Sequence, residues 1–282
     1  MNVIGLGEAG CKISHYLSKY DDYQTFQIDV ENKQYDNFIK IKKLDSHEDY
    51  EEKYKPLKIN VAKGLDTFLI LSGAGAISGA VLRILEQLDN NNVKIIYIKP
   101  RLSELSSLQK TRHRIVSQVL QEYCRSAKLK EFTIIDNSLI EDLLPEIPLD
   151  DYWSPINQLI GDTFHMINFF NKSEPLLKSS NAVPKTAVMS TYSLVDFSNM
   201  QEKKLYDLSF PRAKSYYFAL GKQFIKDNKD ILTQVRQFIS LNDSENCDCS
   251  YEIHQTDYDQ NYVYGYHYAS FVQEQDKNLF TS

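Results

Sequence analysis

The sequence predicts an α/β fold: a parallel sheet with helices on both faces, then a long central helix and a smaller α+β C-terminal domain. In the first half of the chain, short β-rich runs alternate with helical stretches, as is typical of such a sheet. Each run ends in turn-forming residues, at Gly7, Asp29, Gly73, Pro100 and Asn137. In an open, Rossmann-like parallel sheet, that edge is where ligands bind.

The expected strands of this sheet cover residues 2–5, 25–29, 67–71, 94–98 and 131–135. Between them we expect helices at residues 11–19, 78–88 and 105–127, the last with apolar residues at helical spacing. A long helix is expected from Pro148 onwards, because acidic residues suit its start and apolar residues recur as far as Ile167. The charged residues 42–58 are expected to form a loop or a short solvated helix. In the last third we expect strands at residues 214–220, 251–256 and 263–271, with a helix at residues 222–238.

The composition is that of an ordinary globular protein, with 42% hydrophobic and 25% charged residues among 282. The formal net charge of -6 offers no field to hold nucleic acid or an anionic membrane. The longest uncharged run, residues 67–82, contains Gly and Ser and is shorter than the roughly 20 apolar residues that span a bilayer. No signal peptide is recognisable at the start. We therefore expect a cytoplasmic protein that contacts neither nucleic acid nor membrane directly.

The four cysteines, Cys11, Cys124, Cys247 and Cys249, are scattered along the chain. Only the last two are close, and a single residue separates them where a zinc knuckle usually has two. We interpret all four as reduced thiols and expect no resident metal, with a metal at Cys247 and Cys249 as the less favoured alternative.

A glycine cluster with Gly5, Gly7 and Gly10 follows the first expected strand and opens the first helix. Backbone N–H groups at such a helix start can meet a phosphate without Cβ atoms in the way. With Asp29 at the end of the next strand, the spacing also fits a dinucleotide site whose acid binds the ribose. A tight turn without any ligand is the third interpretation.

A second glycine cluster, at residues 72–79, also follows an apolar strand and opens a helix. A dinucleotide fold does not need this second loop, whereas two loops on neighbouring strands suit a single nucleoside triphosphate lying across the sheet edge. No Gly-Lys-Ser/Thr follows, so this is not a Walker A loop. Close packing of a helix on a strand through small residues is the alternative.

Trp153 and Asn157 lie four residues apart at the start of the long helix and therefore share a face. This pair offers an aromatic ring to stack on a purine and an amide to pair with its edge. Trp153 is the only tryptophan in the chain. The alternative is that Trp153 packs at the helix start and Asn157 is an exposed polar residue.

With these motifs the chain resembles the tubulin/FtsZ superfamily. Residues 7–13 look like the family's first nucleotide loop, and residues 73–79 look like its glycine-rich signature, with Ala74, Ala76 and Ile77 as departures. Lys99 and Pro100 also match the family's pattern at the end of their strand. The residues that the resemblance assigns to the nucleotide are Gly7, Glu8, Ala9, Gly10, Cys11, Gly73, Ala74, Gly75, Ala76, Ile77, Ser78, Gly79, Asn137, Trp153 and Asn157.

In this family a loop after the central helix reaches the nucleotide of the next subunit, where its acids polarise the attacking water. Residues 195–200 resemble that loop, with Asp196 as the first acid and Asn199 in the place of the second. An Asn cannot take a proton, so Asp196 alone would activate water. The family's GAGxxP loop has no counterpart, and the acidic residues 44–54 stand in its place.

The resemblance implies a cytoskeletal protein that binds GTP or GDP and polymerises head to tail, with GTPase activity that is weak or completed by the next subunit. Mg²⁺ is a candidate companion ion, with Glu31 as a weak candidate ligand. Residues 1–171 would form the nucleotide-binding domain, residues 172–204 the linker and catalytic loop, and residues 205–282 the smaller domain. The eroded signatures look most like the divergent tubulin-like proteins of phages and plasmids. An adaptor binding residues 273–282 is a further candidate partner.

Two rival functions remain. Ala76, Ile77 and Asn199 motivate a pseudo-GTPase, a structural or regulatory module that does not hydrolyse nucleotide. Gly5, Gly7, Gly10 and Asp29 motivate an NAD-dependent Rossmann oxidoreductase, although the six histidines show no catalytic pairing.

Overall fold

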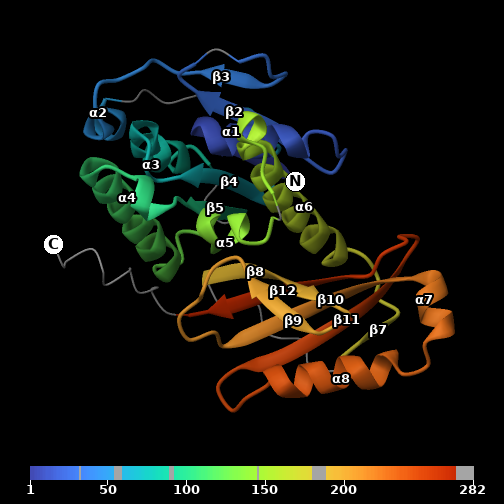
Figure 1. Cartoon of the computed structure of the whole chain (residues 1–282). Coiled ribbons are helices and arrows are strands. Elements are labelled where there is room, and N and C mark those ends of the chain that lie inside the picture. Colours follow the sequence, from blue (N-terminus) through green and yellow to red (C-terminus); the bar gives the residue numbers. More distant parts are fainter. Residues whose placement is uncertain (32, 54–58, 89–91, 145, 180–188, 271–282) are drawn as a thin grey trace. The chain divides into compact units, whose positions relative to one another are not determined.

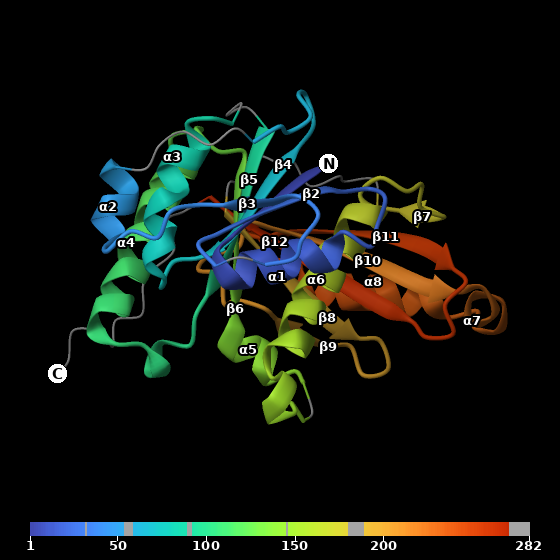
Figure 2. The ribbon, with the colours of Figure 1, turned by 90° about the horizontal axis from the view of Figure 1, so that it is seen from above.

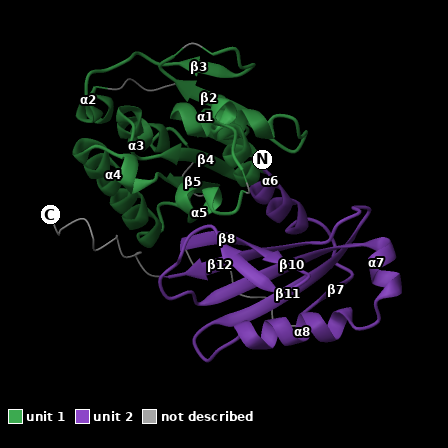
Figure 3. Ribbon diagram, viewed as in Figure 1, with its two compact units in different colours: residues 1–161, 272–282 green, residues 162–271 purple. Residues whose placement is uncertain are grey.

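A computed structural model describes residues 1–31, 33–53, 59–88, 92–144, 146–179 and 189–270. These residues divide into two compact units, unit 1 up to Gly161 and unit 2 from Asp162, so the boundary falls inside helix α6 (Trp153–Phe170) (Figure 3). Residue 271 and the candidate adaptor site at residues 273–282 lie outside the described residues. No helix in the described ranges is long and apolar enough to cross a membrane.

Unit 1 contains a parallel sheet with the strand order β3-β2-β1-β4-β5-β6 (Figure 1). The strands are β1 (Asn2–Leu6), β2 (Gln24–Asp29), β3 (Phe38–Lys40), β4 (Thr67–Ser72), β5 (Val93–Lys99) and β6 (Glu131–Asp136). The expected α/β class is confirmed, and the five longer strands match the sequence prediction to within one residue at each end. Strand β3 was missed because three residues carry too little periodicity.

Helices cover both faces of this sheet. They are α1 (Gly7–Leu17), α2 (His47–Glu52), η1 (Ala76–Ala80), α3 (Val81–Leu85), η3 (Leu102–Glu104), α4 (Ser107–Arg125), α5 (Asn137–Glu141) and η4 (Leu149–Asp151). The chain runs from β1 to β2 in one direction and from β4 to β5 in the other. Because such crossovers are right-handed, α1 lies on one face, and α3 and α4 lie on the other (Figure 2). The strand order therefore reverses beside β1, where an open sheet leaves room for a ligand.

Two helices of unit 1 differ from the expected ones. Helix α1 begins at Gly7 instead of residue 11, because Gly7, at φ +72°, turns the chain directly from strand to helix. The helix expected at residues 78–88 is a 3-10 turn followed by the short α3. The charged stretch around α2 is not simply solvated, since His47 and Tyr50 are buried.

Unit 2 is a mixed sheet with the order β8-β12-β10-β11-β7, and β9 pairs with β8. Its elements are β7 (Leu177–Lys178), β8 (Met189–Asp196), β9 (Gln201–Lys204), β10 (Ala213–Gly221), α7 (Lys222–Asp227), α8 (Ile231–Asn242), β11 (Asp248–Thr256) and β12 (Tyr262–Ala269). Only β10 and β11 are parallel; the other described pairs are antiparallel. The helix expected at residues 222–238 is interrupted between α7 and α8. Strand β8 lies within the expected linker and was missed because its buried Ser190, Thr191 and Ser193 hide the apolar period.

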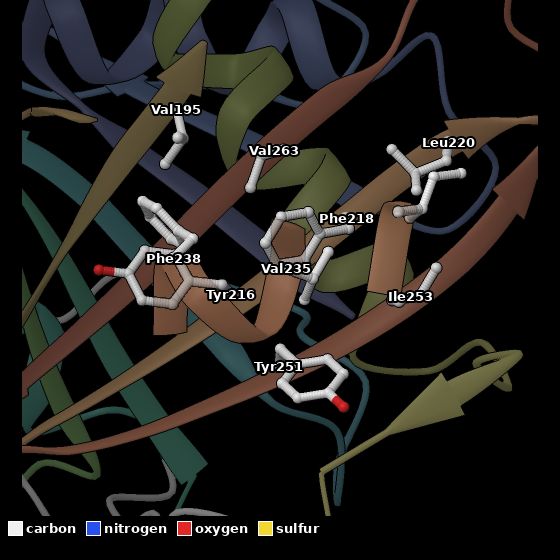
Figure 4. Close-up of a cluster of buried hydrophobic side chains, with 10 residues drawn as sticks. Val195, Tyr216, Phe218, Leu220, Val235, Phe238, Tyr251, Ile253 and Val263 are labelled. Atoms are coloured by element: carbon white, nitrogen blue, oxygen red, sulfur yellow. The ribbon is translucent and has the colours of Figure 1, made fainter. Parts of the chain in front are cut away.

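Helix α8 packs on the sheet of unit 2 through an aromatic core (Figure 4). The ring of Phe238 meets Tyr216 edge to face, with 4.9 Å between centroids. Val235 and Phe218 in the same cluster have no exposed surface. Ring pairs of this geometry add to the free energy gained from burial and fix the helix in register with β10.

A polar cluster crosses the other strands of unit 2. Glu202 Oε1 accepts a hydrogen bond from Ser193 Oγ at 2.6 Å and lies 2.7 Å from His267 Nε2. Burial opposes ionisation of the Glu202 carboxyl, but its bonds with His267 and Ser193 outweigh this and lower its pKa to about 2. The ionised Glu202 thus ties β9 to β8 and β12.

We predict that Glu202→Gln removes stability specifically above pH 4.5. A carboxyl with a depressed folded pKa contributes stability above its unfolded pKa and loses it as the pH falls through the folded value. For a shift from 4.5 to about 2 this contribution is on the order of 3 kcal/mol. Urea denaturation between pH 7 and pH 2 would measure it, with the exposed Glu245→Gln as a control. Equal acid dependence in Glu202→Gln and the wild type would contradict the assignment.

Candidate functional site

A cavity of about 360 Å³ opens in unit 1 at the C-terminal edge of the sheet. The cavity lies where strands β1, β4, β5 and β6 end, at the edge that the sequence predicts for a ligand. Its lining residues are Leu6, Gly7, Glu8, Ala9, Lys12, Ser72, Ala74, Gly75, Ile77, Pro100, Gln109, Asn137, Trp153 and Asn157. The structure therefore brings together parts of both glycine clusters, Asn137 and the Trp153–Asn157 pair.

The first glycine loop presents the N-terminus of α1 to the cavity. Leu6, the residue before the helix, makes no side-chain cap, so the N–H groups of the first turn remain available to a ligand. Gly7 is left-handed and lines the cavity, whereas Gly10 has a packing role. A Cβ at Gly10 would overlap the carbonyl oxygen of Ile70 in β4. Gly10 thus lets α1 lie close against the sheet without itself lining the cavity.

Cys11, expected at the nucleotide, faces the core instead. Its sulfur lies 3.4 Å from the carbonyl oxygen of Ile28, and the residue has no exposed surface. Burial raises the pKa of the thiol to about 12. Cys11 lies on the face of α1 that packs against β2, so its role is in the core behind the loop.

The second glycine loop contributes Ala74, Gly75 and Ile77 to the cavity wall. A Cβ placed on Gly7 would lie 3.1 Å from Ile77 Cγ2, so the two loops are in contact. Ile77 therefore fills space beside the first loop that a glycine would leave open.

The remaining residues of the second cluster brace this loop. The Ser78 hydroxyl donates to the carbonyl oxygens of Gly73 and Gly75, at 3.0 and 2.7 Å. A Cβ at Gly73 would overlap the Tyr97 hydroxyl, and one at Gly79 would overlap the His47 carbonyl oxygen of α2. Ser78, Gly73, Gly79 and also Ala76, which opens η1, are not among the lining residues. Close packing, the alternative weighed for this cluster, explains Gly73 and Gly79.

Trp153 and Asn157 line the cavity together, as their spacing on one helix face predicts. Trp153 is 44% exposed and lies 5.1 Å from Tyr152 with the two rings perpendicular, so part of the indole remains accessible to a planar ligand. Asn157 is buried, with 7% of its surface exposed. The exposed Asn157 of the alternative interpretation is thus not what the structure shows.

Asn137 supplies an unsatisfied polar atom. The residue is 9% exposed, and its side-chain oxygen Oδ1 finds no hydrogen-bond partner within the described parts of the chain. The preceding residue, Asp136, caps α5 by accepting from the Ser138 N–H and pairs with Lys99 at 2.8 Å. Buried polar atoms are nearly always bonded, so Asn137 Oδ1, which has almost no accessible surface, is one of the exceptions among the described residues.

Sequence analysis missed several lining residues, of which Lys12 is the most informative. Lys12 is the only cationic residue among them, and its Nζ lies 2.8 Å from the Glu8 carboxylate. The hydrogen bond from Lys12 lowers the pKa of Glu8. The four-residue spacing of Glu8 and Lys12 on one helix was the available signal. Gln109, also missed, closes the capping box at the start of α4.

The candidate metal and ribose ligands lie away from the cavity wall. Among the lining residues, Glu8 is the only one with a carboxylate, whereas Glu31 is exposed and does not line the cavity. Asp29, the acid that the dinucleotide interpretation needs, is buried and pairs with Lys33 at 3.5 Å. Asp29 is not a lining residue either, which weakens the NAD alternative.

Asp196 and Asn199, the candidate catalytic residues, occupy the exposed turn between β8 and β9 in unit 2. The Asp196 carboxylate accepts from the Ser198 hydroxyl and N–H and from the Asn199 amide, at 2.7 to 2.9 Å. These bonds, with that of the Ser198 hydroxyl first, lower the pKa of Asp196. Asp196 is thus an ionised carboxylate in a tightly bonded turn.

No family model matches the sequence, and no curated protein matches it. Solved structures do match along nearly the whole chain. An empty FtsZ dimer from M. jannaschii gives a TM-score of 0.69 at 12% identity, over 95% of this chain and 87% of that one. GDP-form protofilaments of Bacillus thuringiensis TubZ give 0.68 at 11%, over 95% and 85%. CetZ from Methanosaeta thermophila gives 0.64 at 12%, over 96% and 86%.

The structural neighbours are thus FtsZ, TubZ and CetZ, members of the tubulin/FtsZ superfamily. This chain has the tubulin/FtsZ fold, as the motifs in its sequence predicted.

The two kinds of glycine in this site should respond differently to a methyl group. We predict that Gly10→Ala destabilises the protein by about 1–3 kcal/mol or more, because its Cβ would overlap the backbone of β4. Gly75→Ala should cost less than about 0.5 kcal/mol, since its nearest contact is an ordinary 3.8 Å. Urea denaturation of both variants measures the difference. Equal losses would show that the approach of α1 to β4 does not depend on Gly10.

Proposed function

We propose that this protein binds GTP in the unit 1 cavity and assembles head to tail into cytoplasmic filaments. The observation that carries the proposal is the meeting of an uncapped helix N-terminus, a second glycine loop and the Trp153–Asn157 pair at one sheet edge. Phosphate and purine chemistry are thus offered within one cavity. The neighbouring TubZ structures are protofilaments and filaments, which supports self-association.

In this proposal the phosphates contact the N–H groups at the start of α1 and the backbone of Ala74 and Gly75, beside the Lys12 ammonium. The base stacks on Trp153, and its edge pairs with the Asn157 amide. Asn137 contributes to the cavity wall beside the ligand. Glu8, the one carboxylate among the lining residues, would be the Mg²⁺ ligand. Binding the ion would break its ion pair with Lys12.

Hydrolysis, where it occurs, would use the Asp196 turn of a neighbouring subunit. A heterologous contact of this kind does not close on itself, so it propagates as a filament. Asn199 is an amide and already donates to Asp196, which leaves Asp196 as the only ionisable group of that candidate pair.

A pseudo-GTPase is the second candidate, and one observation favours it. The Ser78 hydroxyl of the glycine-rich loop is already hydrogen-bonded to the carbonyl oxygens of Gly73 and Gly75. Ile77 occupies the space beside Gly7. A loop braced in this way would hold a nucleotide without reorganising around its terminal phosphate.

Calorimetric titration of nucleotide-stripped protein with GTP tests the binding proposal, with ATP and NAD as comparison ligands. We predict selective GTP binding that Asn157→Ala weakens about 10- to 100-fold, because a buried base edge would lose its partner. The exposed Asn246→Ala serves as a matched control. Binding of NAD would instead support the oxidoreductase. An unaltered GTP affinity in Asn157→Ala would contradict the assignment of Asn157 to the base pocket.

Light scattering and sedimentation with GTP test assembly, and phosphate release tests hydrolysis. We predict that the wild type forms pelletable filaments and that Asp196→Ala forms them without releasing phosphate, since that variant lacks the candidate base. Asp259→Ala, another exposed acid of unit 2, should behave as the wild type does. Absence of polymer at any concentration would contradict the filament proposal, and phosphate release no higher than background in both the wild type and Asp196→Ala would favour the pseudo-GTPase.

A further inference from the structure

Cys247 lies in the turn that joins α8 to β11, and Cys249 is the second residue of β11. Ser244 and Cys247 exchange two backbone hydrogen bonds, at 3.1 and 3.2 Å. The Cys249 N–H donates to Asp243 Oδ1 at 3.0 Å. The N–H of the intervening Asp248 donates to the Arg212 carbonyl oxygen, also at 3.0 Å. Backbone hydrogen bonds at Cys247, Asp248 and Cys249 therefore fix the segment that carries the two sulfurs.

A cation faces this pair from the neighbouring strand. Lys214 of β10 lies directly opposite Cys249 in the parallel register of β10 and β11. The Lys214 Nζ donates to Asn242 Oδ1 at the end of α8, at 3.1 Å, which holds the ammonium at the same corner. Asp243 and Asp248 are the acidic groups that act on the thiols in the opposite sense.

The two cysteines lie close together, with Cys249 Sγ 4.0 Å from the Cys247 carbonyl oxygen, and each acts on the ionisation of the other. A hydrogen bond with Cys249 outweighs burial and, with the charge of Lys214, lowers the pKa of Cys247 to about 7. The same bond raises the pKa of Cys249, because its proton stabilises the neighbouring thiolate. Burial instead raises the pKa of Cys11 to about 12 and that of Cys124 further still. Of the four cysteines, only the Cys247–Cys249 pair thus favours a thiolate, the form that reacts.

Access to the pair is through Cys249. Its side chain is partly exposed, whereas Cys247 is 7% exposed and Cys11 and Cys124 have no exposed surface. Neither Cys247 nor Cys249 lines the cavity of unit 1. The pair is therefore not part of the proposed nucleotide site.

We propose that Cys247 and Cys249 form a redox-active dithiol, which closes to an intramolecular disulfide by exchange with a small disulfide such as oxidised glutathione. The thiolate of the pair attacks one glutathione sulfur and expels the other as a thiolate. The second cysteine then loses its proton, attacks the mixed disulfide and expels the second glutathione thiolate. Two electrons and two protons pass from the dithiol to the small disulfide, giving two molecules of glutathione.

Mass spectrometry of the folded protein tests this proposal. Iodoacetamide should label the pair with a midpoint near pH 7, about tenfold faster at that pH than a cysteine with an ordinary pKa of about 8.5, and should spare Cys11 and Cys124. Oxidised glutathione should remove two hydrogen atoms from the peptide that carries both residues, and dithiothreitol should restore them. Lys214→Gln should raise the midpoint of labelling.

The single variants Cys247→Ser and Cys249→Ser give a second test, and circular dichroism shows whether each variant is folded. Cys247→Ser and Cys249→Ser should each stop at a stable mixed disulfide with glutathione, because the resolving sulfur is missing. A midpoint near pH 8.5 in the wild type, or a wild-type mixed disulfide that never resolves, would overturn the proposal. Retained zinc that blocks labelling would also overturn it, in favour of a metal site.

Discussion

The site depends on how closely α1 approaches the sheet. The helix starts without a loop after β1, and a side chain at Gly5 or Gly10 would collide with backbone atoms. This approach places uncapped N–H groups at the point where the strand order reverses. Ile77 then contacts Gly7, so the second loop is positioned by the first. Without these glycines the end of the cavity that the start of α1 forms would not exist.

Much of this architecture could be predicted from the sequence, because buried parallel strands are continuous apolar runs bounded by turn residues. The face shared by Trp153 and Asn157 followed from helical spacing alone. Which glycines line the cavity could not be predicted, since Gly10, Gly73 and Gly79 are required by atoms distant in sequence: Ile70, Tyr97 and His47. The inward-facing side chain of Cys11 could not be predicted either, because the loop pattern does not say which side of α1 meets β2. Strand β8 was missed because its buried residues are largely Ser and Thr.

Unit 2 has a polar organisation of its own. Lys214 and Tyr216 both donate to Asn242 Oδ1, and Tyr216 also donates to Glu202, which bonds His267 and Ser193. These contacts run from the cysteine corner to β9, the strand that follows the Asp196 turn. Buried networks of this kind specify one packing arrangement, since an unmatched member would be costly. They fix the strand that carries the candidate catalytic turn.

The most direct test of the central claim uses Trp153, whose fluorescence is the only tryptophan signal of the chain. If a purine stacks on this ring in the cavity, titration with GTP should change the emission saturably, with the same dissociation constant that calorimetry gives. The change should be absent in Trp153→Phe, whose binding should weaken only moderately. GTP that binds calorimetrically while leaving the Trp153 emission unchanged would contradict the placement of the base.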